Sequence, residues 1–377
     1  MKKKRKKKKS DVWMYGSMEA WKRIRPHIHT SILFSTTLRV KTIARLFASI
    51  LVWLYTIALV AWLVLRAQMG DAVWWLAFPN TFAPYVFGGL VPAALIVWLI
   101  PSRTNVSAWA VAFALFVIWF APEFFPTPPP VAATSNPHIK IMTLNLYEES
   151  IRVEPMLERI RAENPDVVVM QELNPLNATA LPEFHAQFPY HALMPLDGQD
   201  AGMGIISKIP FQEHGWFPLG GQPHDALRVT LDVDGRAVEL LNVHLANNWI
   251  TLYLEKSRNF FDEQNRIREQ QANEIIAFTR AHPTTIVAGD FNLTETTTAY
   301  SILQNNLRDS FRARGWGLGG TFSSEWFWYG RIPVPPRVLR LDYVMHTRAF
   351  ITTDAYIGER DSQSDHLPVI ATLEFAK

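Results

Sequence analysis

The sequence predicts an α+β domain, with sheets covered by helices, that follows three membrane-spanning helices. Three observations lead to this fold class. Residues 1–137 contain long apolar runs, whereas residues 138–377 alternate short strand patterns with helical ones. A stretch rich in Pro and Ala at 126–137 separates the two parts and is expected to be an extended linker. Within the second part, hairpin strand pairs are mixed with helical crossovers, which favours an α+β arrangement.

Charge is distributed very unevenly along the 377 residues. Residues 1–137 contain 16 Lys and Arg against 4 Asp and Glu, and residues 138–377 contain 21 against 30. The net charge of +3 therefore combines +12 in the first part with −9 in the second. The chain has no Cys, which excludes disulfides, thiolate metal sites and cysteine nucleophiles.

The N-terminal segment, residues 1–42, is expected to be a disordered cytoplasmic tail. Lys2 to Lys9 are all basic, and charges of one sign at this density repel one another. Such a run is compatible with a solvated tail, a nuclear-localisation-like signal, nucleic-acid contact or binding to anionic lipid headgroups. The apolar runs that follow make binding to a membrane surface the best functional interpretation.

A membrane anchor of three helices is predicted for residues 43–125. Each apolar run has about the 20 residues that a spanning helix needs. Pro84 and Pro92 in the second run are tolerated inside a helix bundle. The first run is too long for a signal peptide and lacks a small-residue cleavage site. The predicted spans are 43–65, 81–100 and 106–125.

The distribution of Lys and Arg predicts the orientation of this anchor. Basic residues gather before the first span, and Arg103 lies between the second and the third, so both segments should face the cytoplasm. A multi-pass protein of the cell membrane is therefore expected, with a cytoplasmic N-terminus and an extracytoplasmic domain at 138–377. An even number of spans would invert this assignment, which makes the weaker second span decisive.

The domain at 138–377 begins with a predicted strand and ends with one. The Asp234-Gly235 pair is a strong signal for a two-residue hairpin turn between two strands. Pro283 ends a long helix, after which a short apolar strand runs into Gly289. The expected strands are 139–146, 167–170, 202–207, 226–233, 236–244, 286–288, 341–345, 351–356 and 369–375, and the expected helices are 155–163 and 260–280.

Polar residues lie at or beside one end of six of these predicted strands. Each is a weak signal by itself, because a lone His or a Glu after a strand is more often structural. Six in one domain indicate carboxylates, amides and imidazoles that converge on one sheet edge, which is a site for a hard cation with bases beside it. The six are Asn145, Gln171-Glu172, His244, Gly289-Asp290-Phe291-Asn292, Asp342 and Ser364-Asp365-His366.

This ordered set resembles the endonuclease/exonuclease/phosphatase superfamily, over about residues 138–377. The superfamily includes exonuclease III-like nucleases, pancreatic-type deoxyribonucleases, neutral sphingomyelinases and inositol polyphosphate 5-phosphatases. The resemblance implies a four-layer α/β sandwich of two packed mixed sheets flanked by helices. It also implies metal-dependent hydrolysis of a phosphoester.

The resemblance implies Mg²⁺ as cofactor, with Mn²⁺ as a possible substitute. Glu172 would be the principal metal ligand, with Asn145 and Asp365 near the metal. His366 would be the base that prepares the attacking water, oriented by Asp342. A base with a free pKa near neutrality, held in one tautomer by a carboxylate, suits this role.

The remaining implied roles concern the phosphate. Asp290 and Asn292 would contact the phosphate and the nucleophile, and His244 would bind a phosphoryl oxygen or assist the leaving group. A cation and imidazoles are suited to phosphoryl transfer because the reaction requires positioning and neutralisation of developing charge. Arg228 is a further candidate for substrate binding, because family members often carry Arg at a similar position. A structural salt bridge is the default interpretation for both Arg228 and Arg268.

The sequence indicates the class of substrate less directly than the type of reaction. A net charge of −9 does not favour tight binding of a nucleic-acid backbone. The lipid bilayer and a phosphoester substrate, either a lipid headgroup or extracellular nucleic acid, are the expected partners, and no protein partner is expected. The aromatic run Trp326–Tyr329 would either dip into the headgroup layer or pack as a lid. A catalytically silent membrane protein that uses the fold to bind a partner is the alternative.

Overall fold

The computed structural model describes residues 42–125, 137–147, 150, 152–196, 202–220, 225–247, 258–322, 337–359 and 364–376. The basic run at 2–9, the linker at 126–136 and the aromatic run at 326–329 lie outside the described residues.

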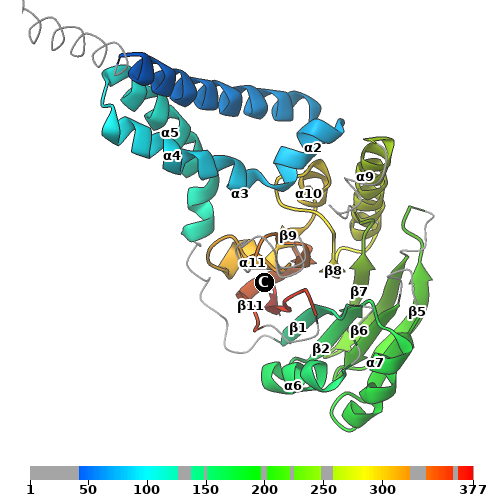
Figure 1. The fold of residues 1–377 in the computed structure, drawn as a ribbon. Coiled ribbons are helices and arrows are strands. Elements are labelled where there is room, and N and C mark those ends of the chain that lie inside the picture. Colours follow the sequence, from blue (N-terminus) through cyan, green and yellow to red (C-terminus); the bar gives the residue numbers. More distant parts are fainter. Residues whose placement is uncertain are drawn as a thin grey trace, which may run out of the picture. The chain divides into compact units, whose positions relative to one another are not determined.

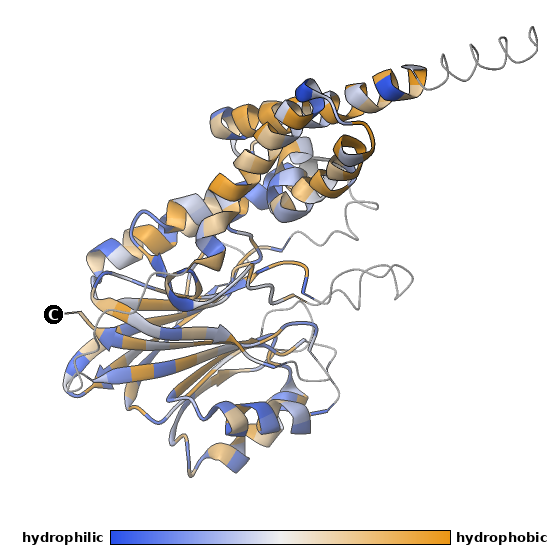
Figure 2. Ribbon diagram, turned by 90° about the vertical axis from the view of Figure 1, so that its left-hand side faces the viewer, coloured by the Kyte–Doolittle hydropathy of each residue, from blue (hydrophilic) through white to orange (hydrophobic). Residues whose placement is uncertain are grey.

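The described part of the chain opens with apolar helices. Thr42–Met69 and Arg103–Phe124 are long and apolar enough to cross a membrane. Between them, Trp74–Thr81 and Ala83–Leu99 pass the same test only as a pair, and the pair is bent by 86°. Hydrophobic residues dominate these helices, as the orange colouring in Figure 2 shows. The segment predicted as a simple second span at 81–100 is therefore the second arm of a bent pair.

The chain divides into two compact units, which the apolar helices share. One unit contains the described residues up to Ala61 together with Gly88–Leu115, and the other contains Trp62–Phe87 and Phe116–Lys377. Inside the first unit, the Thr56 hydroxyl donates to the carbonyl of Ala108 at 3.1 Å, and the Trp109 indole donates to the carbonyl of Leu90 at 3.1 Å. Such side-chain bonds join apolar helices where the surroundings offer few alternative partners.

The second unit contains two six-stranded mixed sheets (Figure 1). The first sheet has the order β11-β12-β1-β2-β4-β3 and the second β5-β6-β7-β8-β10-β9. In each sheet one central pair is parallel, β1 with β2 and β7 with β8, and the other pairs are antiparallel. The strands are β1 (His138–Asn145), β2 (Val167–Gln171), β3 (Tyr190–Met194), β4 (Met203–Ser207), β5 (Phe211–Phe217), β6 (Ala226–Val233), β7 (Arg236–His244), β8 (Thr285–Asp290), β9 (Arg308–Asp309), β10 (Asp342–His346), β11 (Phe350–Ile357) and β12 (Val369–Phe375).

Alternating residues of these strands build the core between the sheets. Side chains on a strand point to opposite faces in turn, so every second residue shares a face. Ile139 and Ile141 of β1 meet Ile286 and Ala288 of β8 in one buried cluster. The two sheets therefore pack face to face through aliphatic side chains.

Helices cover the outer faces of both sheets. Met156, Leu157 and Ile160 form the buried face of one helix and belong to the cluster that covers the first sheet. Ile275 and Ile276 of the longest helix of this unit belong to the cluster on the second sheet. Among the described residues, the helices that lie wholly in this unit are α2 (Trp74–Thr81), α3 (Ala83–Val86), α6 (Glu154–Glu163), α7 (Pro175–Ala180), α9 (Arg258–Ala281), α10 (Thr298–Leu303) and α11 (Ser310–Arg314), with the 3₁₀ turn η2 (Leu181–Phe184).

The four-layer sandwich and all nine predicted strands are present, and three further strands, β3, β5 and β9, were not predicted. β3 and β5 are edge strands, and most of their residues are exposed or half-buried. β9 has only two residues. Edge strands of this kind lack the strict apolar alternation that identifies a half-buried strand, so the sequence pattern does not reveal them.

His346, at the end of β10, is a buried neutral imidazole. Its Nδ1 lies 2.8 Å from the carbonyl of Thr347, and its Nε2 lies 2.8 Å from the Thr352 hydroxyl. Nδ1 therefore donates and Nε2 accepts, which uses both ring nitrogens without a positive charge. Burial lowers the pKa of His346 to about 4, although the bond to Thr347 opposes the shift.

Acidification should therefore weaken the fold through His346. Between pH 6.5 and 4 the unfolded chain binds a proton that the native imidazole refuses, so stability rises with pH across this window and is lost as pH falls. The full loss is on the order of 3 kcal/mol. Equilibrium unfolding at several pH values should show a smaller pH slope for His346→Gln. The matched control His138→Gln, at an exposed position, should retain the wild-type slope. Identical slopes for all three proteins would contradict the assignment.

Candidate active site

The candidate site continues the core between the two sheets toward one edge. Ile141 and Ala288 face the opposite sheet, so Asn145 and Asp290, at the same alternation of their strands, face it too. Asn145 is fully buried, and Asp290 is 1% exposed. The apolar interior thus turns polar where the strands end, and solvent is excluded from the polar groups.

The strand register places three of the polar residues in one row. His244 of β7 pairs with Asp290 of β8, and Asp290 pairs with Asp342 of β10. His244 Nε2 lies 3.7 Å from the Asp290 carboxylate. Residues directly opposite each other in neighbouring strands have adjacent side chains. The sheet order β7-β8-β10 is therefore what brings these distant sequence positions together.

His366 joins this row from the loop before β12. Its Nδ1 lies 2.8 Å from the Asp342 carboxylate, and its Nε2 lies 3.8 Å from that of Asp290. Asp342 therefore fixes the tautomer with a proton on Nδ1 and leaves Nε2 facing the cluster. The ring of Phe322 packs edge-on against the imidazole, with 5.2 Å between the ring centroids.

Glu172 and Asn145 complete the cluster from the first sheet. The Asn145 amide donates to the carboxylate of Glu172 at 2.8 Å and to that of Asp290 at 3.1 Å, so one amide group bridges the two sheets. Glu172 directly follows β2 and has a φ of 55°. A Glu in the left-handed region is unusual, and strained backbone of this kind tends to cluster at functional sites.

Gly289 and Asn292 shape the turn that follows β8. Gly289 has a φ of 149°, and a Cβ there would lie 1.9 Å from the carbonyl oxygen of Val243. Asn292 has a φ of 50°, its backbone N donates to the Asp290 carboxylate at 2.8 Å, and its amide donates to the carbonyl of Leu245 at 3.0 Å. These bonds hold both polar side chains of the Gly289–Asn292 motif in place.

The cluster has a strong electrostatic imbalance. Burial raises the pKa of the Asp290 carboxyl, and the neighbouring Asp342 raises it further, against the opposing effect of His366 and His244. Burial by itself would lower the pKa of His366, but the carboxylates of Asp342 and Asp290 outweigh it and raise that pKa well above its ordinary value. The buried negative charge of neighbouring carboxylates contributes to both shifts.

Such a set of groups fits a divalent cation. Two groups have ligand atoms that all lie within 4.8 Å of one another, Glu172 with His244 and Asp290, and Asp290 with Asp342 and His366. Oxygen ligands from carboxylates and amides suit a hard cation such as Mg²⁺ or Mn²⁺. The Asp342 Oδ1 atom is buried and has no hydrogen-bond partner among the described residues. A bound cation would offset the buried negative charge that contributes to raising the pKa of Asp290 and of His366.

Two residues expected at the site differ in position from the others. Asp365 is buried and lies close enough to His366 to raise its pKa, yet it belongs to neither ligand group. Arg228 is not brought to the site. Leu227 and Val229 beside it face the core between the sheets, so Arg228 points to the outer face. There its Nε donates to Glu239 at 2.9 Å and its guanidinium lies over the ring of Phe278.

Other residues hold the site without having been assigned a role from the sequence. The Ser364 hydroxyl donates to the carbonyl of Asn145 at 2.6 Å and accepts from the backbone N of His366 at 3.0 Å. Gln171 donates to Asn242 at 2.6 Å and so joins the two sheets just below the cluster. Buried Arg268 donates to the carbonyl of Asn292. Ser364 and Gln171 lie within the recognised motifs, which was the available signal.

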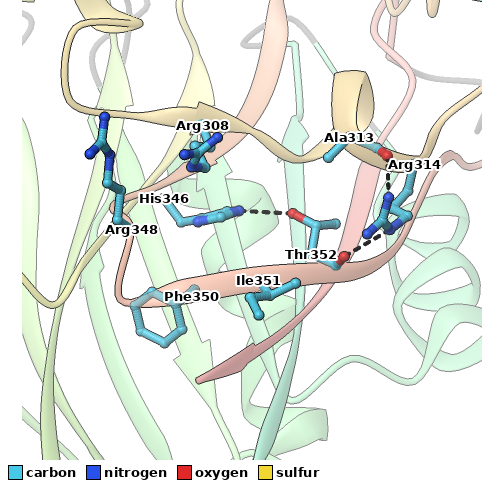
Figure 3. Close-up of a pocket in the computed structure, with 8 residues that line it drawn as sticks. All are labelled: Arg308, Ala313, Arg314, His346, Arg348, Phe350, Ile351 and Thr352. Carbon is cyan, nitrogen blue, oxygen red and sulfur yellow. Dashed lines mark hydrogen bonds between the residues drawn. The ribbon is translucent and has the colours of Figure 1, made fainter. Parts of the chain in front are cut away.

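A cavity of about 380 Å³ lies elsewhere in the domain (Figure 3). His346 borders it, at the end of β10 opposite Asp342. None of its lining residues belongs to the cluster around Asp290. The lining residues are Arg308, Ala313, Arg314, His346, Arg348, Phe350, Ile351 and Thr352.

The fold and this cluster define the protein's class. The profile of the Endonuclease/Exonuclease/phosphatase family matches residues 142–366, which is more than half of the chain, and the chain therefore belongs to this family. Enzymes of the family hydrolyse phosphoester bonds and generally use divalent metal ions. A comparison with curated protein sequences finds no significant match.

Solved structures share the fold at low sequence identity. The endonuclease/exonuclease/phosphatase from Beutenbergia cavernae is 22% identical, with a TM-score of 0.50, over 64% of this chain and 72% of that chain. D. rerio TDP2, humanized by 14 mutations, is 18% identical with a TM-score of 0.51, over 63% and 99%. The endonuclease/exonuclease/phosphatase from Bacteroides vulgatus is 20% identical with a TM-score of 0.50, over 63% and 99%.

Gly289→Ala should destabilise the domain far more than a matched glycine substitution. The new Cβ would overlap the carbonyl oxygen of Val243, and the backbone would have to shift, at a cost of about 3 kcal/mol or more. Gly235 also has a positive φ, of 80°, but a Cβ there would meet nothing within 4 Å, so Gly235→Ala should cost only about 1 kcal/mol. Denaturant unfolding measures both values. Equal costs would show that the close approach at Gly289 is absent.

Proposed function

We propose that this protein is a membrane-anchored, Mg²⁺-dependent phosphoesterase that hydrolyses a phosphodiester by attack of an activated water. The observation that carries the proposal is the buried convergence of Glu172, Asp290 and Asp342 with two imidazoles. Phosphoryl transfer depends mainly on positioning and on neutralising charge, and this cluster offers groups for both.

The proposed roles follow from the geometry of the groups. Glu172 would be the principal ligand of the cation, with Asn145 and Asp365 beside it. The bound cation would neutralise charge on the phosphoryl oxygens. The proton on His366 Nδ1 is donated to the Asp342 carboxylate in a hydrogen bond, which leaves Nε2 as the basic nitrogen. Nε2 would accept a proton from the attacking water.

The other side chains would act on the phosphate. His244 lies beside both Glu172 and Asp290, at 3.9 and 3.7 Å, and would donate a hydrogen bond to a phosphoryl oxygen. Asp290 and Asn292 would contact the phosphate and the nucleophile. Because Arg228 is held by Glu239 on the outer face of its sheet, we do not include it among the substrate-binding residues.

Substitutions in the cluster test the activity. The full-length protein in detergent micelles should hydrolyse bis-p-nitrophenyl phosphate with Mg²⁺ and lose this activity when EDTA removes the metal. Glu172→Ala and His366→Ala should each lower kcat by about 100-fold to 10,000-fold. Glu213→Ala and His214→Ala, at exposed positions of the edge strand β5, are matched controls and should keep wild-type rates.

Lipid headgroups and extracellular nucleic acid are the proposed substrates. A panel of sphingomyelin, phosphoinositides, and single- and double-stranded DNA should separate them by kcat/KM. A wild-type protein without activity on any phosphodiester or monoester, with Mg²⁺ or Mn²⁺, would refute the enzymatic proposal. It would favour a catalytically silent membrane protein that uses this fold for binding.

We also propose that the N-terminus is cytoplasmic and that the catalytic domain lies outside the cytoplasm. The basic segments around the apolar helices support this orientation. It requires the bent pair Trp74–Thr81 and Ala83–Leu99 to supply one crossing. Protease added to intact cells should therefore digest the domain at 138–377, and a cytoplasmic marker protein should stay intact. Full protection of the domain would show that the bent pair re-enters without crossing.

A further inference from the structure

The segment Trp62–Phe87 belongs to the same compact unit as the catalytic domain, although it lies between apolar helices in the sequence. Its contacts concentrate on the loop that follows Asn292. That loop contains Thr294, Thr296 and Thr297, all of which are buried. This loop lies close to the candidate site and is held by a segment that is distant in sequence. Catalysis by the two-sheet domain does not by itself require such an attachment.

Asp71 makes the first set of contacts. It is 5% exposed, and its carboxylate accepts hydrogen bonds from the backbone N of Thr298 and from the amide of Asn80, both at 2.6 Å. Its own backbone N donates to the Thr298 hydroxyl at 3.0 Å. The chain approaches so closely that a Cβ on Gly70 would lie 2.4 Å from that hydroxyl. Charge-assisted bonds of this kind are among the stronger ones in proteins.

A second set of contacts involves the loop's carbonyls and hydroxyls. The Arg66 guanidinium donates twice to the carbonyl of Thr296, at 2.8 and 3.1 Å. The hydroxyl of Thr296 donates to the carbonyl of Asn80, and that of Thr294 donates to the carbonyl of Thr81 at 3.2 Å. Several of the loop's buried polar groups thus have their hydrogen-bond partners in Trp62–Phe87.

Two short paths lead from this segment to the catalytic cluster. In the first, Asn265 donates to the carbonyl of Asp71 at 3.4 Å, and Arg268 donates both to Asn265 and to the carbonyl of Asn292. The peptide group of Asn292 is thereby connected to the segment Trp62–Phe87 through the buried side chains of Asn265 and Arg268.

The second path is apolar. Phe82 and Tyr85 pack against a cluster that includes Phe322 and Val338, and the Tyr85 hydroxyl donates to the carbonyl of Val338 at 2.8 Å. Phe322 in turn contacts the ring of His366. The imidazole is therefore connected to Phe82 and Tyr85 through the apolar cluster that contains Phe322.

We propose that Trp62–Phe87 is a positioning element of the active site, in addition to being part of the anchor. It holds the loop after Asn292 and supports Phe322 against His366, and so fixes the geometry of both residues. A displacement of about 1 Å at a reacting group can cost about 100-fold in rate. This inference rests on the proposed function, because the geometry that it fixes is that of the proposed phosphoesterase site.

The same contacts constrain the membrane topology. Asp71 follows the first apolar helix, and Thr298 lies in the catalytic domain, so their hydrogen bonds require both to be on one side of the membrane. An even number of crossings must therefore separate them. The second arm of the bent pair together with Arg103–Phe124 gives two, whereas a re-entrant pair would leave only one.

The test uses the full-length protein in nanodiscs with a soluble substrate, bis-p-nitrophenyl phosphate. Asp71→Ala and Thr298→Val should lower kcat about tenfold or more, while KM changes by less than about twofold. Amide hydrogen exchange of residues 291–298 should become faster in both variants. Thr298→Ser retains the hydroxyl and should restore the wild-type kcat. Thr179→Val, at an exposed position, is the matched control and should change neither measurement.

The outcomes separate this inference from the proposed function. Unchanged exchange in Asp71→Ala and Thr298→Val would overturn the docking of the segment. Faster exchange with an unchanged kcat would overturn the positioning role. Wild-type protein that hydrolyses no phosphoester would refute the proposed function, and hydrogen exchange would still decide whether the segment holds the loop.

Discussion

Asp290 and Asp342 face each other across neighbouring antiparallel strands, buried at the end of the sandwich core. Like charges in this position repel, and burial makes each of them costlier. The arrangement persists because His366 bonds to one carboxylate, while His244 and Asn145 lie against the other. The repulsion between these two carboxylates must be compensated by other groups at this end of the core. It also explains why imidazoles, an amide and a site fitted to a cation occur together there.

The two-sheet architecture makes such an arrangement possible. The same alternation that sends Ile141 and Ala288 into the apolar core sends Asn145 and Asp290 into the polar cluster a short distance further along. The core keeps water away, so each charge acts through a low dielectric. Folding energy comes from the aliphatic part of the interface, and the chemistry sits at its edge, in keeping with the general rule that functions are carried by sites rather than folds.

The segment Trp62–Phe87 and the two-sheet domain are also less separate than the linear order of the chain implies. Hydrogen bonds from Asp71 and Arg66 reach the loop that leaves the Gly289–Asn292 motif, and Phe82 supports the aromatic contact to His366. An enzyme tied to a membrane only by a flexible linker would need none of these contacts. These contacts connect the proposed active site with the segment Trp62–Phe87. They also explain why that segment contains buried polar residues.

The sequence by itself determined the class of fold, the apolar helices and the identity of almost every residue in the cluster. These follow from local rules, since strand alternation, turn residues and the order of short motifs are all written along the chain. Only the tertiary structure decided which of these residues meet. It placed His244, Asp290 and Asp342 in one row, because sheet order is a long-range property. It turned Arg228 to the outer face, because neighbouring side chains alternate. It also showed that the second apolar segment is one arm of a pair of helices bent by 86°. Finally, it brought Asp71 to Thr298, a contact between residues more than 200 positions apart that no local pattern encodes.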